Sequence, residues 1–224
     1  MMTVNELAGS IDLTLLKPQA TIKDVETLVY EAQKYPFASV CIPPCHVKLA
    51  AKMLKDSPTK IGTVIGFPLG YQTTSAKLHE SLEAVDAGAG EIDMVINISY
   101  FKSGEQSMVQ DEIAAIVSAC SGILVKAIIE TCYLTDEEKV MACELAIKGG
   151  ADFVKTSTGF GPGGATVNDI RLLANTTAGR IGVKASGGIK NLDDTLKMID
   201  AGANRIGTSA GIKIIEEFLK RFKG

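Results

Sequence analysis

Short runs of β-type residues alternate with helical patterns along the whole chain, and this alternation limits the possible folds more than any other feature. The candidate strands are residues 11–14, 38–42, 60–66, 91–97, 124–130, 152–157, 180–186 and 205–208. Several are apolar at most positions, which is typical of parallel strands that are covered on both faces. Strands that alternate with helices predict a parallel sheet with crossover connections.

The segments between these strands carry signals for the starts and ends of helices. Thr135 and Glu138 have the spacing of a capping box. Gly88, Gly150 and Gly202 each stand just before a predicted strand, where a left-handed residue commonly ends a helix. Because no linker or change of composition interrupts the chain, we expect one domain over residues 1–224. The predicted fold class is α/β, a closed (β/α)8 TIM barrel with a short extra N-terminal helix, rather than an open doubly wound sheet.

Composition excludes several classes of function. The chain has 224 residues and a formal net charge of −3, which argues against a protein that binds nucleic acid or anionic lipid. It shows neither a signal peptide nor an apolar stretch of membrane-spanning length, so we expect a cytoplasmic protein with no membrane partner. Cys41, Cys45 and His46 could suggest a zinc site, but prolines fill the spacing and no second cysteine pair follows. We therefore predict no metal site and reduced thiols.

Three lysines occur in similar contexts on successive predicted strands. Lys126, Lys155 and Lys184 are 29 residues apart and each follows a valine. If the valines pack outward, period-2 alternation turns all three amines into the barrel lumen, in one layer. A single lysine of this kind is usually a solvated side chain, but three together favour a buried cluster. Burial and like charge both disfavour an ammonium ion, so the cluster predicts a neutral amine able to attack a carbonyl.

Asp93 lies on the strand before these lysines, between apolar residues. It could neutralise the lysines as a buried ion pair. It could also pass protons to and from a substrate. The sequence allows both roles at once.

Glycine-rich loops follow the last three strands. Residues 159–164 match the G-x-G-x-x-G pattern, but Pro162 lies inside the turn and no acidic residue ends the next strand, so we reject a dinucleotide site. Gly187 and Gly188 follow the seventh strand, and Gly207-Thr208-Ser209 closes the eighth before a helix that starts near Ala210. These are the loops from which barrels commonly build a phosphate site. The other reading is that the glycines only permit tight turns.

With these motifs in place, the sequence resembles the deoxyribose-phosphate aldolases along nearly its whole length. The matching motifs are Asp12-Leu13-Thr14, Glu91-Ile92-Asp93, Val154-Lys155-Thr156-Ser157-Thr158-Gly159, Lys184-Ala185-Ser186-Gly187-Gly188 and Gly207-Thr208-Ser209. The lysine and glycine motifs together are highly specific, whereas Asp12-Leu13-Thr14 alone would be weak.

The resemblance implies a role for each matched position. Lys155 would form an imine with acetaldehyde, Lys184 would lower the pKa of that amine and share in proton transfer, Asp93 would donate and accept protons, and Lys126 would support this relay. The implied sugar pocket consists of Asp12, Thr14, Cys41 and Thr158, and the implied phosphate site of Gly159, Gly187, Gly188, Gly207 and Ser209. Phe160 and Ala210 depart from the family pattern, since some members carry a basic residue and a second serine there.

The resemblance further implies a lyase of deoxyribose phosphate catabolism. Its partners would be a small phosphosugar and acetaldehyde; it would need no metal or organic cofactor and would form a homo-oligomer. Three alternatives remain open: a transaldolase-like Schiff-base enzyme that prefers a ketone donor, a metal-dependent aldolase, and a non-catalytic barrel that binds phosphosugars.

Overall fold

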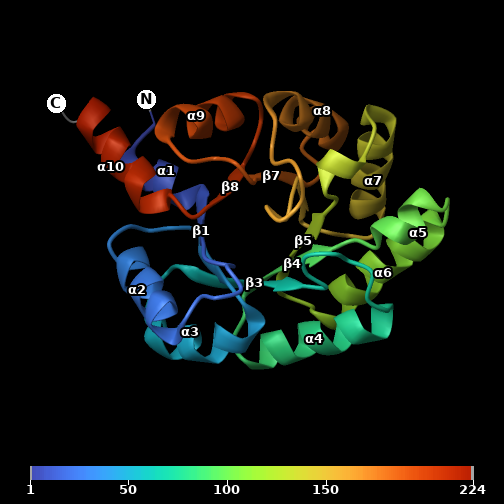
Figure 1. The fold of residues 1–224 in the computed structure, drawn as a ribbon, viewed down its shortest axis with the longest axis horizontal. Coiled ribbons are helices and arrows are strands. Elements are labelled where there is room, and N and C mark those ends of the chain that lie inside the picture. Colours follow the sequence, from blue (N-terminus) through green and yellow to red (C-terminus); the bar gives the residue numbers. More distant parts are fainter. Residues whose placement is uncertain (1, 223–224) are drawn as a thin grey trace.

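The computed structural model describes residues 2–222 and shows a closed barrel of eight parallel strands (Figure 1). The strands pair in chain order and β8 closes onto β1. Their bounds are β1 Ile11–Thr14, β2 Ser39–Ile42, β3 Lys60–Ile65, β4 Glu91–Val95, β5 Leu124–Ile128, β6 Phe153–Lys155, β7 Gly182–Ser186 and β8 Arg205–Thr208. The predicted barrel is confirmed. β1 and β8 have the predicted bounds, and the other six strands are one to three residues shorter than predicted.

Helices form a ring outside the strands (Figure 1). They are α1 Val4–Gly9, α2 Ile22–Ala32, α3 Val47–Met53, α4 Thr74–Asp86, α5 Ile98–Lys102, α6 Gln106–Ala119, α7 Asp136–Lys148, α8 Val167–Thr177, α9 Leu192–Asp200 and α10 Gly211–Phe222, with the short 3-10 helices η1 Pro44–His46 and η2 Thr131–Tyr133. The predicted N-terminal helix is α1, which packs beside α10 near both chain ends. Helix α5 was not predicted. No helix within residues 2–222 is long and apolar enough to cross a membrane.

The capping box and the helix-ending glycines predicted from the sequence are present in the structure. Thr135 accepts a hydrogen bond from the backbone N–H of Glu138, and the Glu138 side chain accepts one from the backbone N–H of Thr135, which is a complete capping box. Gly88, Gly150 and Gly202 have φ angles of 110°, 80° and 111°. Each therefore ends a helix in a conformation that favours glycine.

The valines that precede the lysines lie in the hydrophobic core. Val125, Val154 and Val183 are almost fully buried, among the apolar residues packed between the barrel and its helices. Because side chains alternate along a strand, the following lysines face the lumen, as predicted.

The three lysines do not share one layer of the lumen. Lys155 lies directly opposite Lys184 across β6 and β7. Lys126 lies opposite Asp93, and Ile128 rather than Lys126 lies opposite Lys155. The prediction of one layer is therefore wrong for Lys126, which is one layer nearer the amino ends of the strands. The stagger of strands in a closed barrel sets this offset, and equal spacing in sequence does not reveal it.

Replacing the cap of α7 should destabilise the protein measurably. Thr135→Ala removes one half of the capping box, and we expect it to lower the free energy of unfolding by about 1 kcal/mol. Thr27→Ala is a suitable comparison, because Thr27 is exposed inside α2 and its hydroxyl bonds only the carbonyl of Lys23. Urea unfolding of both variants should show the larger loss for Thr135→Ala.

Candidate active site

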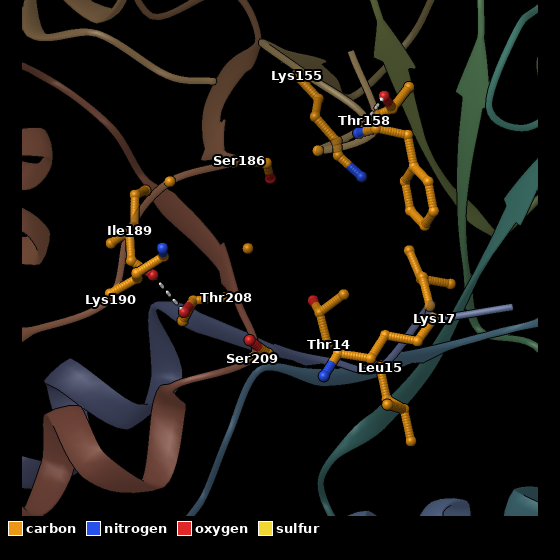
Figure 2. Close-up of a pocket in the computed structure, with 16 residues that line it drawn as sticks. Thr14, Leu15, Lys17, Lys155, Thr158, Ser186, Ile189, Lys190, Thr208 and Ser209 are labelled. Atoms are coloured by element: carbon orange, nitrogen blue, oxygen red, sulfur yellow. Dashed lines mark hydrogen bonds between the residues drawn. The ribbon is translucent and has the colours of Figure 1, made fainter. Parts of the chain in front are cut away.

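A cavity of about 350 Å³ opens at the carboxyl ends of the strands, between the loops that follow β1, β6, β7 and β8 (Figure 2). It is lined by Thr14, Leu15, Leu16, Lys17, Lys155, Thr158, Gly159, Phe160, Ser186, Gly187, Gly188, Ile189, Lys190, Gly207, Thr208 and Ser209. This end of the barrel is where enzymes with this fold carry their catalytic groups.

Lys155 lies at the floor of this cavity. Figure 2 shows its side chain extending into the cavity from the end of β6. The residue is only 3% exposed, and its Nζ lies 2.8 Å from Asp93 Oδ2. The amine is therefore almost dry and open to a ligand on one side.

Asp93 joins the three lysines. Its Oδ2 accepts hydrogen bonds from Lys155 and from Lys184, the latter at 2.6 Å, and its Oδ1 accepts one from Lys126 at 2.6 Å. Burial alone would raise the pKa of Asp93, but the three amino groups outweigh burial and hold that pKa well below its usual range. Asp93 is therefore ionised at neutral pH.

Lys184 and Lys155 have opposite pKa shifts. Burial would lower the pKa of Lys184, but the carboxylates of Asp12 and Asp93 outweigh burial and raise that pKa above its usual value. The pKa of Lys155 is lowered, first by burial and then by the charge of Lys184, with Asp93 opposing both. At neutral pH Lys184 is therefore the cation of the resting site, and Lys155 is the amine that loses its proton more readily.

The balance of charges in the lumen explains why the pKa of Lys155 is lowered and that of Lys184 is raised. The ion-paired cluster contains four bases and three acids, namely Lys126, Lys155, Lys184, Arg205, Asp12, Glu91 and Asp93. With six of these groups ionised and the Lys155 amine neutral, positive and negative charges balance. A proton on Lys155 would leave one unbalanced charge in a dry interior, which is costly.

The predicted site residues fall into two sets. Eight line the cavity: Thr14, Lys155, Thr158, Gly159, Gly187, Gly188, Gly207 and Ser209. The other five, Lys184, Asp93, Lys126, Asp12 and Cys41, do not line it and are at most 1% exposed.

Asp12 was expected in the sugar pocket, and the structure places it away from the cavity. Its Oδ2 lies 2.5 Å from Lys184 Nζ, and its Oδ1 accepts a hydrogen bond from Arg205 Nε at 2.9 Å. Asp12 stands two residues before Thr14, so it occupies the layer below, and Thr14 reaches the cavity instead. Cys41 lies opposite Thr14 and is also covered; burial and the charge of Asp93 raise the pKa of its thiol.

One end of the cavity presents free backbone N–H groups. Gly159, Gly187 and Gly188 have φ angles of 84°, 87° and 83°. Within residues 2–222 their N–H groups donate to no acceptor, and the same holds for Ser209, which lies just before α10. Left-handed turns and helix N-termini of this kind form concave sites for anions. Lys17 and Lys190 also line the cavity.

Several contributors were missed by the sequence reasoning. Glu91 and Arg205 complete the charged cluster, and a signal was available, because each stands two residues before a predicted site position and so shares its face. Lys17 and Lys190 follow strand ends but lack any distinguishing pattern. Glu130 is buried two residues after β5 and is hydrogen-bonded to Thr158.

The described part of the chain contains no group of three or more His, Cys, Asp or Glu side chains arranged to hold a metal ion. Cys45 and His46, which the sequence brought into question as zinc ligands, form no such group there.

Comparison with known proteins identifies the family to which this chain is similar. The model of the DeoC/LacD family aldolases matches residues 7–217. The deoxyribose-phosphate aldolase of Caldanaerobacter subterraneus subsp. tengcongensis is 56% identical over 221 residues, which cover 97% of this chain and 96% of that protein. The one from Clostridium kluyveri is 52% identical over 217 residues, covering 96% of this chain and 100% of that protein.

Solved structures agree with this. The aldolase QR15 superposes with a TM-score of 0.93 at 46% identity, covering 99% of this chain and 98% of the other. The tetrameric deoxyribose phosphate aldolase of Aeropyrum pernix gives a TM-score of 0.90 at 36% identity, covering 96% and 92%. The resemblance read from the sequence motifs is thus confirmed, and the chain belongs to the DeoC/LacD family of aldolases.

Proposed function

We propose that this enzyme reversibly cleaves 2-deoxy-D-ribose 5-phosphate to D-glyceraldehyde 3-phosphate and acetaldehyde, through an imine on Lys155. The observation that carries the proposal is the almost fully buried amine of Lys155 at the cavity floor. Lys184, which is ionised, lies directly beside it on the adjacent strand β7. The substrate follows from the relatives, which are named deoxyribose-phosphate aldolases.

The first step joins the neutral amine of Lys155 to C1 of the open-chain sugar. The amine attacks the aldehyde carbon, and the carbonyl oxygen leaves as water with one proton from the amine and one from an acid. Lys184 is the candidate acid, because the carboxylates of Asp12 and Asp93 keep it protonated. The resulting protonated imine withdraws electrons from the neighbouring carbon.

The second step breaks the bond between C2 and C3. The C3 hydroxyl loses its proton, C3 becomes the aldehyde of glyceraldehyde 3-phosphate, and the bonding electrons move through C2 to the imine nitrogen, giving an enamine. Asp93 is ionised but does not line the cavity, so it is the candidate acceptor of this proton through water or through Lys184, to which it is hydrogen-bonded.

The third step returns the proton to C2 of the enamine, and water then hydrolyses the acetaldehyde imine. Atoms balance with the one water that the first step released. Lys126 bonds Asp93 Oδ1, whereas Lys155 and Lys184 share Oδ2, so we assign Lys126 a supporting role.

The phosphate would bind at the opposite end of the cavity. Free N–H groups of Gly159, Gly187, Gly188 and Ser209 supply its donors, next to the start of α10. Because Phe160 stands where some relatives carry a basic residue, backbone amides would hold more of the phosphate here.

We further propose a cytoplasmic homo-oligomer. The tetrameric relative from Aeropyrum pernix supports self-association. A doubly charged sugar phosphate does not cross membranes freely, which supports an enzyme located where that substrate is made.

Trapping the imine tests the central step. Lys155→Ala should abolish aldolase activity and also the mass increase seen after borohydride reduction with acetaldehyde, because the attacking amine is gone. Lys213→Ala, which removes an amine whose side chain is 62% exposed, should keep both. An adduct that persists in Lys155→Ala would contradict the assignment.

The wild-type enzyme distinguishes the three alternative functions. If it binds phosphosugar without forming a trappable imine, it is a non-catalytic barrel. If EDTA abolishes its activity, it is a metal-dependent aldolase, and if it prefers a ketone donor, it is a transaldolase-like enzyme.

Removing the cation beside Lys155 should shift the pH dependence. Lys184→Leu removes a like charge and leaves Asp12 and Asp93 less compensated, and both changes raise the pKa of Lys155. The neutral amine then appears only at higher pH, so the acidic limb of imine formation with acetaldehyde should move to higher pH. Lys184→Arg, which keeps the charge, should shift it less. An unchanged midpoint in Lys184→Leu would contradict the electrostatic role.

The phosphate end can be tested with two matched glycines. Gly188 and Gly179 have φ angles of 83° and 78°, and a Cβ at either position would meet nothing within 4 Å. Both alanine variants should lose stability by about 1 kcal/mol from backbone strain. Only Gly188→Ala should raise KM for the phosphorylated sugar, with little change for free 2-deoxyribose, since Gly179 follows α8 away from the cavity. Equal KM effects in both variants would argue against a phosphate site at Gly188.

A further inference from the structure

Glu130, which follows β5, has a backbone conformation that is unusual for a residue with a side chain. Its φ and ψ are 49° and 68°, in the left-handed region. The other described non-glycine residue with positive φ is Ala178, which ends α8, where this conformation is common. Glu130 ends no helix; it lies between β5 and η2. Strained residues of this kind persist where surrounding contacts determine them, and they cluster at functional sites.

The side chain of Glu130 is hydrogen-bonded mainly to Thr158, and the Cys132 Sγ also lies 3.8 Å from Glu130 Oε1. It is 2% exposed, and both carboxylate oxygens lie 3.2 Å from the backbone nitrogen of Thr158. The Thr158 hydroxyl also donates to Glu130 Oε2. Within residues 2–222 no lysine, arginine or histidine nitrogen lies within 4.0 Å of this carboxylate. Two donors on Thr158 and the thiol of Cys132, and not a counter-ion, compensate the buried carboxylate.

This contact fixes the turn that borders the cavity. The Thr158 oxygen accepts a hydrogen bond from the backbone N–H of Phe160 at 3.0 Å. The backbone N–H and the hydroxyl of Thr158 both donate to Glu130, so Thr158 has no donor left for a ligand. The intervening N–H, that of Gly159, stays free at the cavity.

The turn also packs closely on the carboxylate, and the chain beside Glu130 holds the segment that carries Lys155. A Cβ added to Gly161 would lie 3.3 Å from Glu130 Cδ. Ile129 N donates to Lys155 O at 3.0 Å, and Thr131 N donates to Thr156 O at 2.9 Å. The residues on either side of Glu130 thus bind the end of β6, while its side chain binds the turn that follows.

We infer that Glu130 is a positioning residue for the cavity rim formed by Thr158, Gly159 and Phe160, which we call the β6 rim. It acts through Thr158 to present the free Gly159 N–H to the anionic group of the substrate. The amine of Lys155 is governed separately, by the charged cluster in the lumen. The identity of the ligand in this inference rests on the proposed function.

Glu130→Gln tests the inference with little change in size. The amide is neutral, so its oxygen accepts more weakly than the carboxylate from the N–H and hydroxyl of Thr158, and its NH2 group puts a donor where Oε1 faces the Thr158 N–H and the Cys132 thiol. We expect KM for 2-deoxyribose 5-phosphate to rise about tenfold, which is about 1.4 kcal/mol, with kcat within about twofold of wild type. Borohydride trapping with acetaldehyde should proceed at the wild-type rate, because acetaldehyde has no anionic group to meet the β6 rim.

Two further variants separate the carboxylate from the backbone. Glu130→Gly adopts the left-handed conformation without strain but removes the anchor, so its KM should rise at least as much. Thr158→Val removes the hydroxyl partner, and its effect on KM should not add to that of Glu130→Gln, because both break one contact. Glu112→Gln is the matched control: Glu112 is equally buried but pairs with Lys77 between α4 and α6, so this variant should lose thermal stability and keep the wild-type KM.

The outcomes are distinguishable. KM unchanged in both Glu130 variants, or KM and the trapping rate altered together as in a general loss of structure, would overturn the positioning role. Additive effects of Glu130→Gln and Thr158→Val would overturn the route through Thr158. Failure of the wild-type enzyme to trap acetaldehyde would instead overturn the proposed function.

Discussion

The site depends on one carboxylate, that of Asp93, surrounded by three lysine amines in a lumen where all four side chains are almost fully buried. Seven ionisable side chains can be buried together only if their charges match. Lys184 and Lys126 each contact two carboxylates at 2.7 Å or less, whereas Lys155 contacts only an oxygen that it shares with Lys184. The least compensated amine is thus the one at the cavity.

Barrel geometry makes this arrangement possible. Asp93 stands in the layer of Lys126, one layer below Lys155, so Lys155 binds a carboxylate that is itself closed off from the cavity. The charges that set the pKa of Lys155 therefore lie beneath the space that a substrate occupies. A ligand can fill that space without displacing any of these ion pairs, because none of the three carboxylates lines it.

Much of this arrangement follows from periodicity. Alternation predicts that Lys126, Lys155 and Lys184 face inward, and glycines mark the loops at the cavity. The layer of Lys126 and the covered position of Asp12 were not predictable, since strand stagger depends on closure of the whole barrel and leaves no local pattern. Glu130 was missed for a different reason. Its main partner, Thr158, is 28 positions away in the sequence. Its left-handed conformation also contradicts the local preference of glutamate, and such exceptions occur at functional sites, where local sequence patterns do not predict the structure.

The cavity divides into two ends with different physical demands. At the floor, a neutral Lys155 amine is favoured only in a buried lumen whose charges balance. Ion pairs between side chains of six strands, β1 and β4 to β8, provide this balance. The rim presents backbone N–H groups on short glycine turns, and the buried Glu130 carboxylate contacts one of these turns. Under the proposed function these N–H groups would bind the phosphate. Only two residues lie between Lys155 and Thr158, so the two ends are close in the chain although different contacts hold each one. Under the proposed function, we therefore expect substitutions at the rim to change which acceptor aldehyde is preferred while imine formation at Lys155 is retained.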